Sequence, residues 1–239
     1  MRSPEMRRQL LSEEPSEHQL ARLSQARQDM VGRWDRMYAM AGAAPDYEPT
    51  AEKSIAALAA RGNASPQEVA YDYLTEGLDK FLFFPIVNYA DGDHATVQEM
   101  LTDPATLLGL SDAGAHCGAI VDASVPSFML THWGRDRSRG PKLPLPQLVK
   151  MQTSETADFF GFIDRGRLAP GLRADVNLID FDRLRLHQPE VAYDLPAGGR
   201  RLVQRADGYR ATLVAGTPVF ENGEDTGARP GRLVRASQA

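Results

Sequence analysis

An apolar run over residues 107–110 ends abruptly in Ser111 and Asp112, and small residues follow as far as His116. This pattern is typical of a buried parallel strand whose last residues emerge into a loop at its C-terminal end. In barrel and doubly wound enzymes, the chemistry takes place at that end of the strands. Asp112 is therefore a candidate metal ligand or general base. The alternative is an aspartate that hydrogen-bonds its own loop.

The segments around this strand follow an order that suits an α/β fold. Residues 50–76 predict two helices, and the second begins with a capping box over residues 65–68. Residues 81–87 predict a buried strand, residues 97–101 lie on a helix, and residues 106–110 predict the next strand. Strands and helices that alternate in this way fit the repeating units of a parallel barrel.

The C-terminal half changes character twice. Residues 115–146 form a long connection with few periodic features, and loops of this length inside compact domains are usually functional or partly disordered. From Gly171 onward short strands dominate, and the Asn222–Gly223 step predicts a hairpin. We therefore expect two domains, residues 1–165 and residues 166–239.

Five segments of the C-terminal half occur in an order that points to a known enzyme family. They span residues 148–161, 164–171, 174–182, 212–223 and 224–232. This series resembles the C-terminal portion of the metal-dependent amidohydrolases (amidohydrolase family 3). The last segment looks most like the branch of the N-acyl-D-amino-acid deacylases (D-aminoacylases). The resemblance implies an α/β fold, in which the C-terminal part of a TIM-like (β/α) barrel is followed by part of a small β-sandwich.

The resemblance also implies a site and a cofactor. Asp112 would match the family's catalytic aspartate, which contacts the metal, accepts a proton from the attacking water and passes one to the leaving amine. The cofactor would be zinc. Members also carry a His-x-His pair, a bridging Lys, Cys or Glu, and two single histidines on earlier strands. None of the five histidines here forms a His-x-His pair. We therefore expect that the chain lacks the upstream metal-ligand strands and is inactive alone.

Four further residues are candidates for substrate binding, each with a plainer alternative. They are Ser111, His116, His132 and Arg135. Ser111 could instead only orient the strand end, and backbone groups could satisfy His116. His132 and Arg135 lie in the long connection. An arginine there could recognise a substrate carboxylate by bidentate pairing, and a solvated basic loop is the alternative.

The composition excludes several classes of protein. The formal charge of −5 gives no basic surplus that would attract nucleic acid or anionic lipid. No apolar run approaches the roughly 20 residues that span a bilayer, and the N-terminus lacks the apolar core of a signal peptide. The single cysteine, Cys117, excludes an internal disulfide and a cysteine-built zinc site. We expect a cytoplasmic protein with no nucleic-acid or membrane partner.

The resemblance predicts a hydrolase that acts on carbon–nitrogen bonds other than peptide bonds. Its substrate would be an N-acyl amino acid or a related small amide, and its macromolecular partner would be the missing N-terminal half or a second copy. Two alternatives stay open. One is a non-catalytic interaction module or pseudo-enzyme that keeps the C-terminal part of the fold. The other is a complete small hydrolase with a different site.

Overall fold

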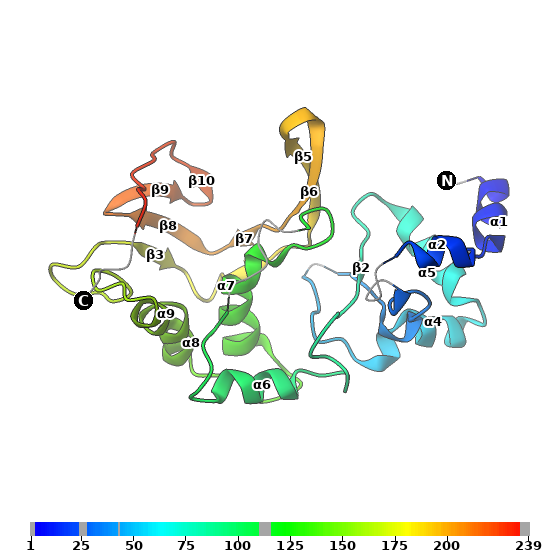
Figure 1. The fold of residues 1–239 in the computed structure, drawn as a ribbon, viewed down its shortest axis with the longest axis horizontal. Coiled ribbons are helices and arrows are strands. Elements are labelled where there is room, and N and C mark those ends of the chain that lie inside the picture. Colours follow the sequence, from blue (N-terminus) through cyan, green and yellow to red (C-terminus); the bar gives the residue numbers. More distant parts are fainter. Residues whose placement is uncertain (1–2, 24–27, 43, 110–115, 235–239) are drawn as a thin grey trace. The chain divides into compact units, whose positions relative to one another are not determined.

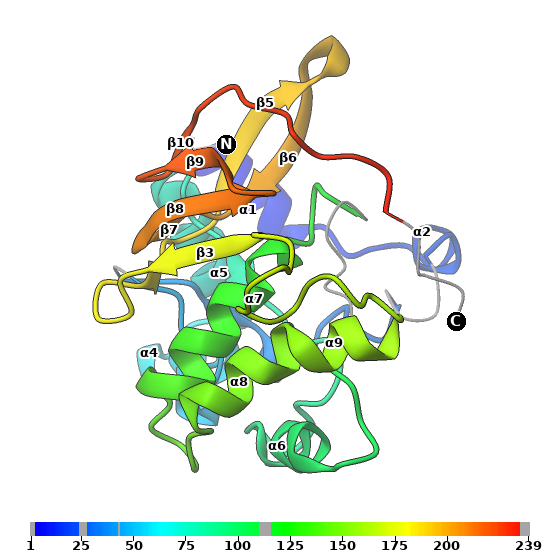
Figure 2. The same ribbon diagram turned by 90° about the vertical axis from the view of Figure 1, so that its left-hand side faces the viewer.

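The computed structural model describes residues 3–23, 28–42, 44–109 and 116–234. The chain packs into two compact units, residues 1–96 and residues 97–239. Figures 1 and 2 show the helices and strands of each. The division near residue 165 that the sequence suggests is a different one, and it stays a prediction.

The first unit is mainly helical. Its helices are α1 (Pro4–Ser12), α2 (Glu17–Ala21), α4 (Ile55–Gly62) and α5 (Pro66–Glu76), with short 3-10 turns η1 (Trp34–Arg36) and η2 (Ala51–Lys53). Its strands β1 (Tyr38–Ala39) and β2 (Leu82–Phe83) pair antiparallel. The two helices expected between residues 50 and 76 are confirmed as α4 and α5.

The capping box expected at residues 65–68 begins α5. The Ser65 hydroxyl accepts a hydrogen bond from the Glu68 amide (3.2 Å), and the Glu68 carboxylate accepts one from the Ser65 amide (2.9 Å). These bonds satisfy two amides that the start of a helix would otherwise leave without partners. The hydrogen bond from the Ser65 backbone is the main reason that the pKa of the Glu68 carboxyl lies below its usual value.

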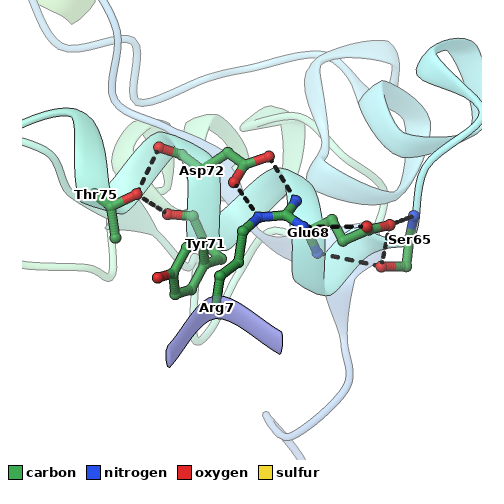
Figure 3. Close-up of polar contacts among 6 residues, drawn as sticks. All are labelled: Arg7, Ser65, Glu68, Tyr71, Asp72 and Thr75. Carbon is green, nitrogen blue, oxygen red and sulfur yellow. Dashed lines mark hydrogen bonds and ion pairs between the residues drawn. The ribbon is translucent and has the colours of Figure 1, made fainter. Parts of the chain in front are cut away.

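Helix α1 is attached to α5 through one arginine, as Figure 3 shows. Arg7 Nε and Nη2 donate to the two carboxylate oxygens of Asp72, both at 2.9 Å. Arg7 Nη1 lies 3.6 Å from Glu68 Oε1, and the guanidinium lies 5.8 Å from the centre of the Tyr71 ring. No residue of α1 is buried. Polar contacts, rather than apolar packing, therefore hold this helix.

The interior of the first unit is small. Ile55, at the start of α4, is completely buried, and Tyr38 and Tyr89 are nearly so. The Ile55 amide donates to the carbonyl oxygen of Met37 (2.8 Å), which links the residue before β1 to the start of α4. The Tyr89 hydroxyl donates to the carbonyl oxygen of Pro49 (2.6 Å). Burial of the Ile55 side chain contributes about 1.5–3 kcal/mol.

Among the described residues of the second unit, all helical elements except η5 precede the strands. The helical elements are α6 (Ala95–Thr102), which begins at the end of the first unit, η3 (Asp122–Ser124), α7 (Val125–Phe128), the π-helix η4 (Met129–Asp136), α8 (Leu145–Gln152), α9 (Ser154–Phe159) and η5 (Pro196–Gly198). The strands are β3 (Val176–Ile179), β4 (Arg185–Leu186), β5 (Glu190–Leu195), β6 (Gly199–Val203), β7 (Ala206–Asp207), β8 (Tyr209–Val214), β9 (Thr217–Glu221) and β10 (Glu224–Asp225).

These strands form three separate sheets. The largest has the order β10-β9-β8-β3, and the others are the pairs β4-β7 and β5-β6. Every strand pair among the described residues is antiparallel. The expected combination of helices and sheets is confirmed, and so is the concentration of short strands after Gly171. The TIM-like barrel and the β-sandwich stay proposals.

The interior of the second unit forms where η4 packs against α8. Seven buried apolar residues make up this core: Met129, Leu130, Trp133, Leu143, Leu148, Met151 and Leu184. The carbonyl oxygen of Trp133 accepts a hydrogen bond from the Leu143 amide (2.8 Å), so the segment after η4 folds back onto it. Burial of Leu148 and of Leu184, both completely inaccessible, contributes about 1.5–3 kcal/mol each.

Gly208 allows the backbone between β7 and β8 to lie close to this core. Its φ is +99°, a backbone conformation that side-chain-bearing residues rarely adopt, and a Cβ at this position would lie 2.6 Å from Leu184 Cα. Leu184 belongs to the core, and the backbone at residue 208 lies too close to it for a side chain to fit between them. Only glycine meets both conditions.

Two tight turns close the hairpins of the largest sheet. Ala215 and Gly216 connect β8 to β9 with φ values of 50° and 77°, and Asn222 and Gly223 connect β9 to β10 with 51° and 86°. Positive φ at both positions is the type I′ geometry that suits two-residue hairpins. The hairpin expected at Asn222–Gly223 is thus confirmed.

Two expected strands are not formed as the sequence suggests. In residues 81–87 only β2 is a strand, and Ile86 and Val87 are 56% and 72% exposed. Residues 106–109 are in no strand, and Leu110 lies outside the described residues. An apolar run favours burial, but a strand also needs hydrogen-bonded neighbours. The described residues give β2 only β1 as a partner.

The long connection expected over residues 115–146 is wrong in part, because η3, α7 and η4 lie within it. A π-helix closes i→i+5 hydrogen bonds, so its apolar residues do not recur with the 3.6-residue period by which an α-helix is recognised.

Across the described ranges, no helix combines the length and the apolar character that crossing a membrane requires.

Candidate functional site

The two residues at the centre of the predicted site, Ser111 and Asp112, lie outside the described residues. The structure resumes at His116, which is exposed and has a φ of +46°. The carbonyl oxygen of His116 accepts hydrogen bonds from the amides of Ala119 (2.7 Å) and Ile120 (3.0 Å). These bonds turn the chain over residues 116–120, and the His116 side chain is exposed.

His132 belongs to the π-helix η4 and is half-buried. Its ring stacks on Phe128 with the centroids 4.6 Å apart and the planes 11° from parallel. The Trp133 ring lies edge-on to it at 5.3 Å. Two aromatic neighbours therefore fix the orientation of this imidazole. Its predicted role in substrate binding stays a prediction.

Arg135, on the same helix, makes contacts within the protein. Its Nε and Nη2 donate to the Asp136 carboxylate at 2.6 and 2.9 Å, Nη2 also donates to the carbonyl oxygen of Leu184 at 2.6 Å, and Nη1 donates to that of Phe181. The guanidinium lies 5.3 Å from the centre of the Phe181 ring. The hydrogen bond to Asp136 is the main reason that the pKa of Arg135 is raised. These contacts tie η4 to residues 181–184.

An open groove of about 1030 Å³ lies beside Arg135. His187, for which the sequence predicts no role, lines this groove. His187 Nε2 is 2.9 Å from Asp207 Oδ1, and Arg185 Nε donates to Asp207 Oδ2 at 2.7 Å. Arg185 and Asp207 are direct partners in the β4–β7 register. Hydrogen bonds, first from His187 and then from Arg185, lower the pKa of the Asp207 carboxyl. The carboxylate thereby orients the imidazole as in an acid–base pair.

A second pair of titratable groups occurs in the first unit. Glu48 is buried, its Oε1 accepts a hydrogen bond from the His94 amide (2.9 Å), and its Oε2 lies 3.9 Å from His94 Nδ1. The Tyr89 ring lies edge-on to His94 at 5.0 Å. The two residues are 46 positions apart in the sequence, so no motif spacing connects them.

The donor chemistry of this pair suits zinc, which binds imidazole nitrogen and carboxylate oxygen. Zinc sites in proteins use three or four such ligands. Glu48 and His94 would therefore be part of a ligand set and not the whole of it.

Comparisons with known proteins agree with the sequence resemblance. The sequence model of the amidohydrolase family matches residues 19–220. An uncharacterized protein of Mycobacterium bovis and one of Mycobacterium tuberculosis are each 30% identical to the chain over 205 residues, which is 78% of this chain and 32% of each relative. The chain thus spans about a third of the length of these curated relatives.

Solved structures that match this chain include D-aminoacylases. One is a crystal structure described as defining a novel subset of amidohydrolases, with 24% sequence identity and a TM-score of 0.45. Another was solved to study the binuclear metal centre of D-aminoacylase, with 23% identity and the same TM-score. Each match covers 84% of this chain and 38% of the other. Because the family model matches most of the residues of this chain, the chain belongs to the amidohydrolase family.

Proposed function

We propose that this chain carries the catalytic aspartate of a hydrolase that cleaves the amide bond of an N-acyl-D-amino acid or a related small amide. The observation that carries the proposal is the amidohydrolase match over residues 19–220, which includes Asp112 at the end of its apolar run. The choice of substrate rests on residues 224–232, which resemble the closing segment of the D-aminoacylases.

In the proposed reaction, water adds to the amide carbonyl carbon and the carbon–nitrogen bond breaks, which yields a carboxylate and an amine. Asp112 accepts the proton from the attacking water and delivers one to the departing nitrogen, as a general base and then a general acid. Zinc, when bound, supplies Lewis-acid polarisation of the amide carbonyl. Ser111, His116 and His132 are proposed to contact the substrate. Arg135 is the weaker candidate, because much of its guanidinium is engaged within the protein.

We propose that these 239 residues do not hydrolyse the amide by themselves. They contain no His-x-His pair, and Asp112 with scattered histidines does not make up the three or four ligands of a zinc site. The remaining ligands would come from a further segment or from a partner chain. The proposed setting is the cytoplasm, and the single cysteine is compatible with that compartment.

A non-catalytic role is the second candidate, and the missing His-x-His pair is the observation that favours it. In that case the chain would be an interaction module or pseudo-enzyme of the family. The two candidates differ in what happens when the predicted upstream ligand strands are supplied. Only the hydrolase would then turn over an N-acyl-D-amino acid.

The test uses a protein that joins this chain to those ligand strands. Asp112→Asn should keep the fold and lower kcat by a factor on the order of 10² or more, because proton transfer by a positioned group contributes about 10²–10⁴. Asp79→Asn is the matched control, since the Asp79 side chain is exposed on the surface of the first unit. Unchanged turnover by the Asp112 variant would remove this residue from the mechanism.

A further inference from the structure

The two-stranded sheet of β4 and β7 has an apolar face and a basic face. Leu186 of β4 is buried, and Leu184, just before this strand, is completely inaccessible. Arg185 lies between these leucines and His187 follows them, and the side chains of both reach solvent. Because successive side chains of a strand point to opposite faces, burial of the leucines turns Arg185 and His187 outward.

Strand β7 places an acidic residue on the same outward face, and the residue before it is basic. Arg185 is the direct partner of Asp207, and the His187 amide donates to the carbonyl oxygen of Arg205 (2.9 Å), which makes His187 and Arg205 partners as well. Partners in an antiparallel pair carry their side chains on one face of the sheet. Arg185, His187 and Arg205 therefore share this face with the Asp207 carboxylate.

Carboxylates hold two of these arginines at one edge of the guanidinium group. Arg185 Nε donates to Asp207 (2.7 Å), and Arg205 Nε donates to Glu190 (3.0 Å). The remaining N–H donors of a guanidinium are on Nη1 and Nη2. In both arginines these atoms donate to no other described residue, and the side chains are 65% and 76% exposed. The carboxylates thus orient the two arginines and leave the Nη atoms for a ligand.

Arg183 reaches the same groove from the turn before β4. Its Nε lies 3.8 Å from Asp180 Oδ2, and this carboxylate oxygen also accepts a hydrogen bond from Arg210 Nη2 (2.8 Å). One carboxylate therefore lies between two arginines and offsets the charge of one of them. Arg183 is as exposed as Arg205, so its guanidinium is open to a ligand as well.

The groove gathers arginines in a chain whose overall charge is negative. The chain carries a formal charge of −5. The described residues that line the groove include three carboxylates, Asp182, Asp207 and Glu224, and five arginines, Arg135, Arg183, Arg185, Arg205 and Arg210. A local excess of arginine in an acidic protein draws an anion to the groove rather than to the surface at large.

The spacing of the arginines indicates the size of this anion. Residues two apart on one face of a strand are roughly 6.7 Å apart, and diagonal neighbours on paired strands, such as Arg185 and Arg205, are about 7–8 Å apart. A guanidinium binds one phosphate group through two parallel hydrogen bonds. A single phosphate group would therefore leave part of this arginine set unused. The groove, with its volume of about 1030 Å³, has room for two linked phosphate groups.

We propose that the groove binds a small anion that carries a diphosphate group, and that Arg183, Arg185 and Arg205 hold it through their Nη atoms. A terminal phosphate group carries up to about two negative charges and three strong acceptor oxygens. A carboxylate offers a single charge and two oxygens, so it satisfies fewer of these donors. The inference does not depend on the proposed function, because it involves neither Asp112 nor a metal.

The test titrates the full chain with inorganic pyrophosphate, by isothermal titration calorimetry in a buffer free of divalent metal. The parent should bind one pyrophosphate per chain. Arg183→Gln and Arg205→Gln should each weaken the affinity on the order of tenfold, since each removes one charged fork. Both side chains are exposed, so the variants should unfold at the parent's temperature.

Arg201→Gln is the matched control. Arg201, on β6, is also exposed, and its Nε and Nη2 donate to the Asp194 carboxylate, both at 2.7 Å. It is absent from the described lining of the groove. The variant therefore loses the same charge and a similar ion pair, and it should bind pyrophosphate as the parent does.

Three further titrations test the chemistry of the ligand. Arg205→Lys keeps the charge and loses the planar fork, so its affinity should fall between those of the parent and Arg205→Gln. Malonate, with two carboxylates, should bind the parent more weakly than pyrophosphate. Adenosine diphosphate carries the same group as an ester. Affinity equal to that of pyrophosphate would show that the groove accepts esters, and weaker affinity would assign it to free pyrophosphate.

Three outcomes would overturn the inference. If the parent bound no pyrophosphate, the site would not exist, whether or not the variants fold. If Arg201→Gln lost as much affinity as Arg183→Gln and Arg205→Gln, the binding would reflect general attraction to surface charge. If malonate bound more tightly than pyrophosphate, diphosphate would be the wrong class of ligand. Failure of the joined enzyme to hydrolyse an amide would count against the proposed function and leave these titrations unaffected.

Discussion

Arg7 and Asp72 are joined by two parallel hydrogen bonds, each 2.9 Å long, and this pair connects α1 with α5. The hydrogen bond from Arg7 is the main reason that the pKa of the Asp72 carboxyl lies below its ordinary value of 3.8. Because the pKa is lowered in the folded state, the stabilisation is complete above pH 3.8. It is lost as the pH falls through the lowered value.

We therefore expect Arg7→Gln to release α1, seen as faster amide exchange over residues 4–12 at neutral pH. The parent should show the same release only under acidic conditions, below the ordinary carboxyl pKa. Arg8→Gln changes the exposed neighbouring residue and serves as the control. Equal exchange in the two variants would mean that other contacts hold the helix.

Gly208→Ala should destabilise the second unit more than Gly223→Ala does. Both glycines have positive φ, so both variants carry backbone strain of about 1–2 kcal/mol. Only at Gly208 would the new Cβ also meet backbone, 2.6 Å from Leu184 Cα, whereas nothing lies within 4 Å at Gly223. The overpacking should add about 1–3 kcal/mol to the loss in free energy of unfolding. Urea unfolding measures both variants, and equal losses would show that Leu184 moves aside freely.

The closing segment that resembles the D-aminoacylases contains an exposed ion pair with several hydrogen bonds. Arg229 donates two hydrogen bonds to the Asp225 carboxylate, at 2.9 and 2.6 Å, and the Gly227 amide donates a third at 2.8 Å. The hydrogen bonds from Arg229, followed by the one from Gly227, lower the pKa of Asp225 to about 2. The stabilisation from this pair is therefore complete above pH 3.8 and is lost as the pH falls toward 2.

Titration of the Asp225 carboxyl by NMR should show a midpoint near 2 in the parent chain. Arg229→Gln should move the midpoint up toward the ordinary 3.8, because the charged donor is gone. Arg232→Gln, a change three residues further along the same segment, should leave the midpoint unchanged. A midpoint near 3.8 in the parent would show that the pair does not persist in solution.

Features governed by local rules could be predicted from the sequence. The capping box at residues 65–68 depends on two side chains three residues apart, and the Asn222–Gly223 turn depends on which residues tolerate positive φ. Both are present in the structure. The family resemblance was also recognisable, because it rests on the order of several segments rather than on one contact.

Features that depend on distant partners could not be predicted. Glu48 meets His94 across 46 residues, and Ser124 meets Gln204 across 80. No local pattern encodes either distance. The π-helix η4 has a period that differs from 3.6, so the sequence predicts a long connection where His132 and Arg135 lie on a helix. The neighbouring Asp136 was the one local sign that Arg135 has a partner inside the protein.

The chain alone should hold well under one zinc ion per molecule after dialysis. Glu48 and His94 supply two donors of suitable chemistry, and tight zinc binding usually takes three or four. Elemental analysis gives the stoichiometry. Stoichiometric zinc that is lost in His116→Ala or His132→Ala would show that these histidines are ligands. A stoichiometric ion lost in His94→Ala would assign that role to His94.

The final prediction concerns exposed apolar side chains at the end of α9 and in the segment after it. Phe159, Ile163 and Leu168 are 71%, 78% and 84% exposed. Apolar groups clustered on a surface favour association, since burial of each removes apolar area from water. We expect the chain alone to form oligomers or aggregates, with a mass by light scattering above the 26.3 kDa of one copy.

Replacement of two of these residues, Phe159→Glu with Ile163→Lys, adds one charge of each sign and should shift the chain toward the monomer. Leu178→Lys is the control, because Leu178 is also exposed but lies on β3. If association depended on exposed apolar area in general, the control would act like the double variant. If the parent chain were a monodisperse monomer with cooperative unfolding, these 239 residues would close their own core, and the expectation that they need a further segment would fail on physical grounds.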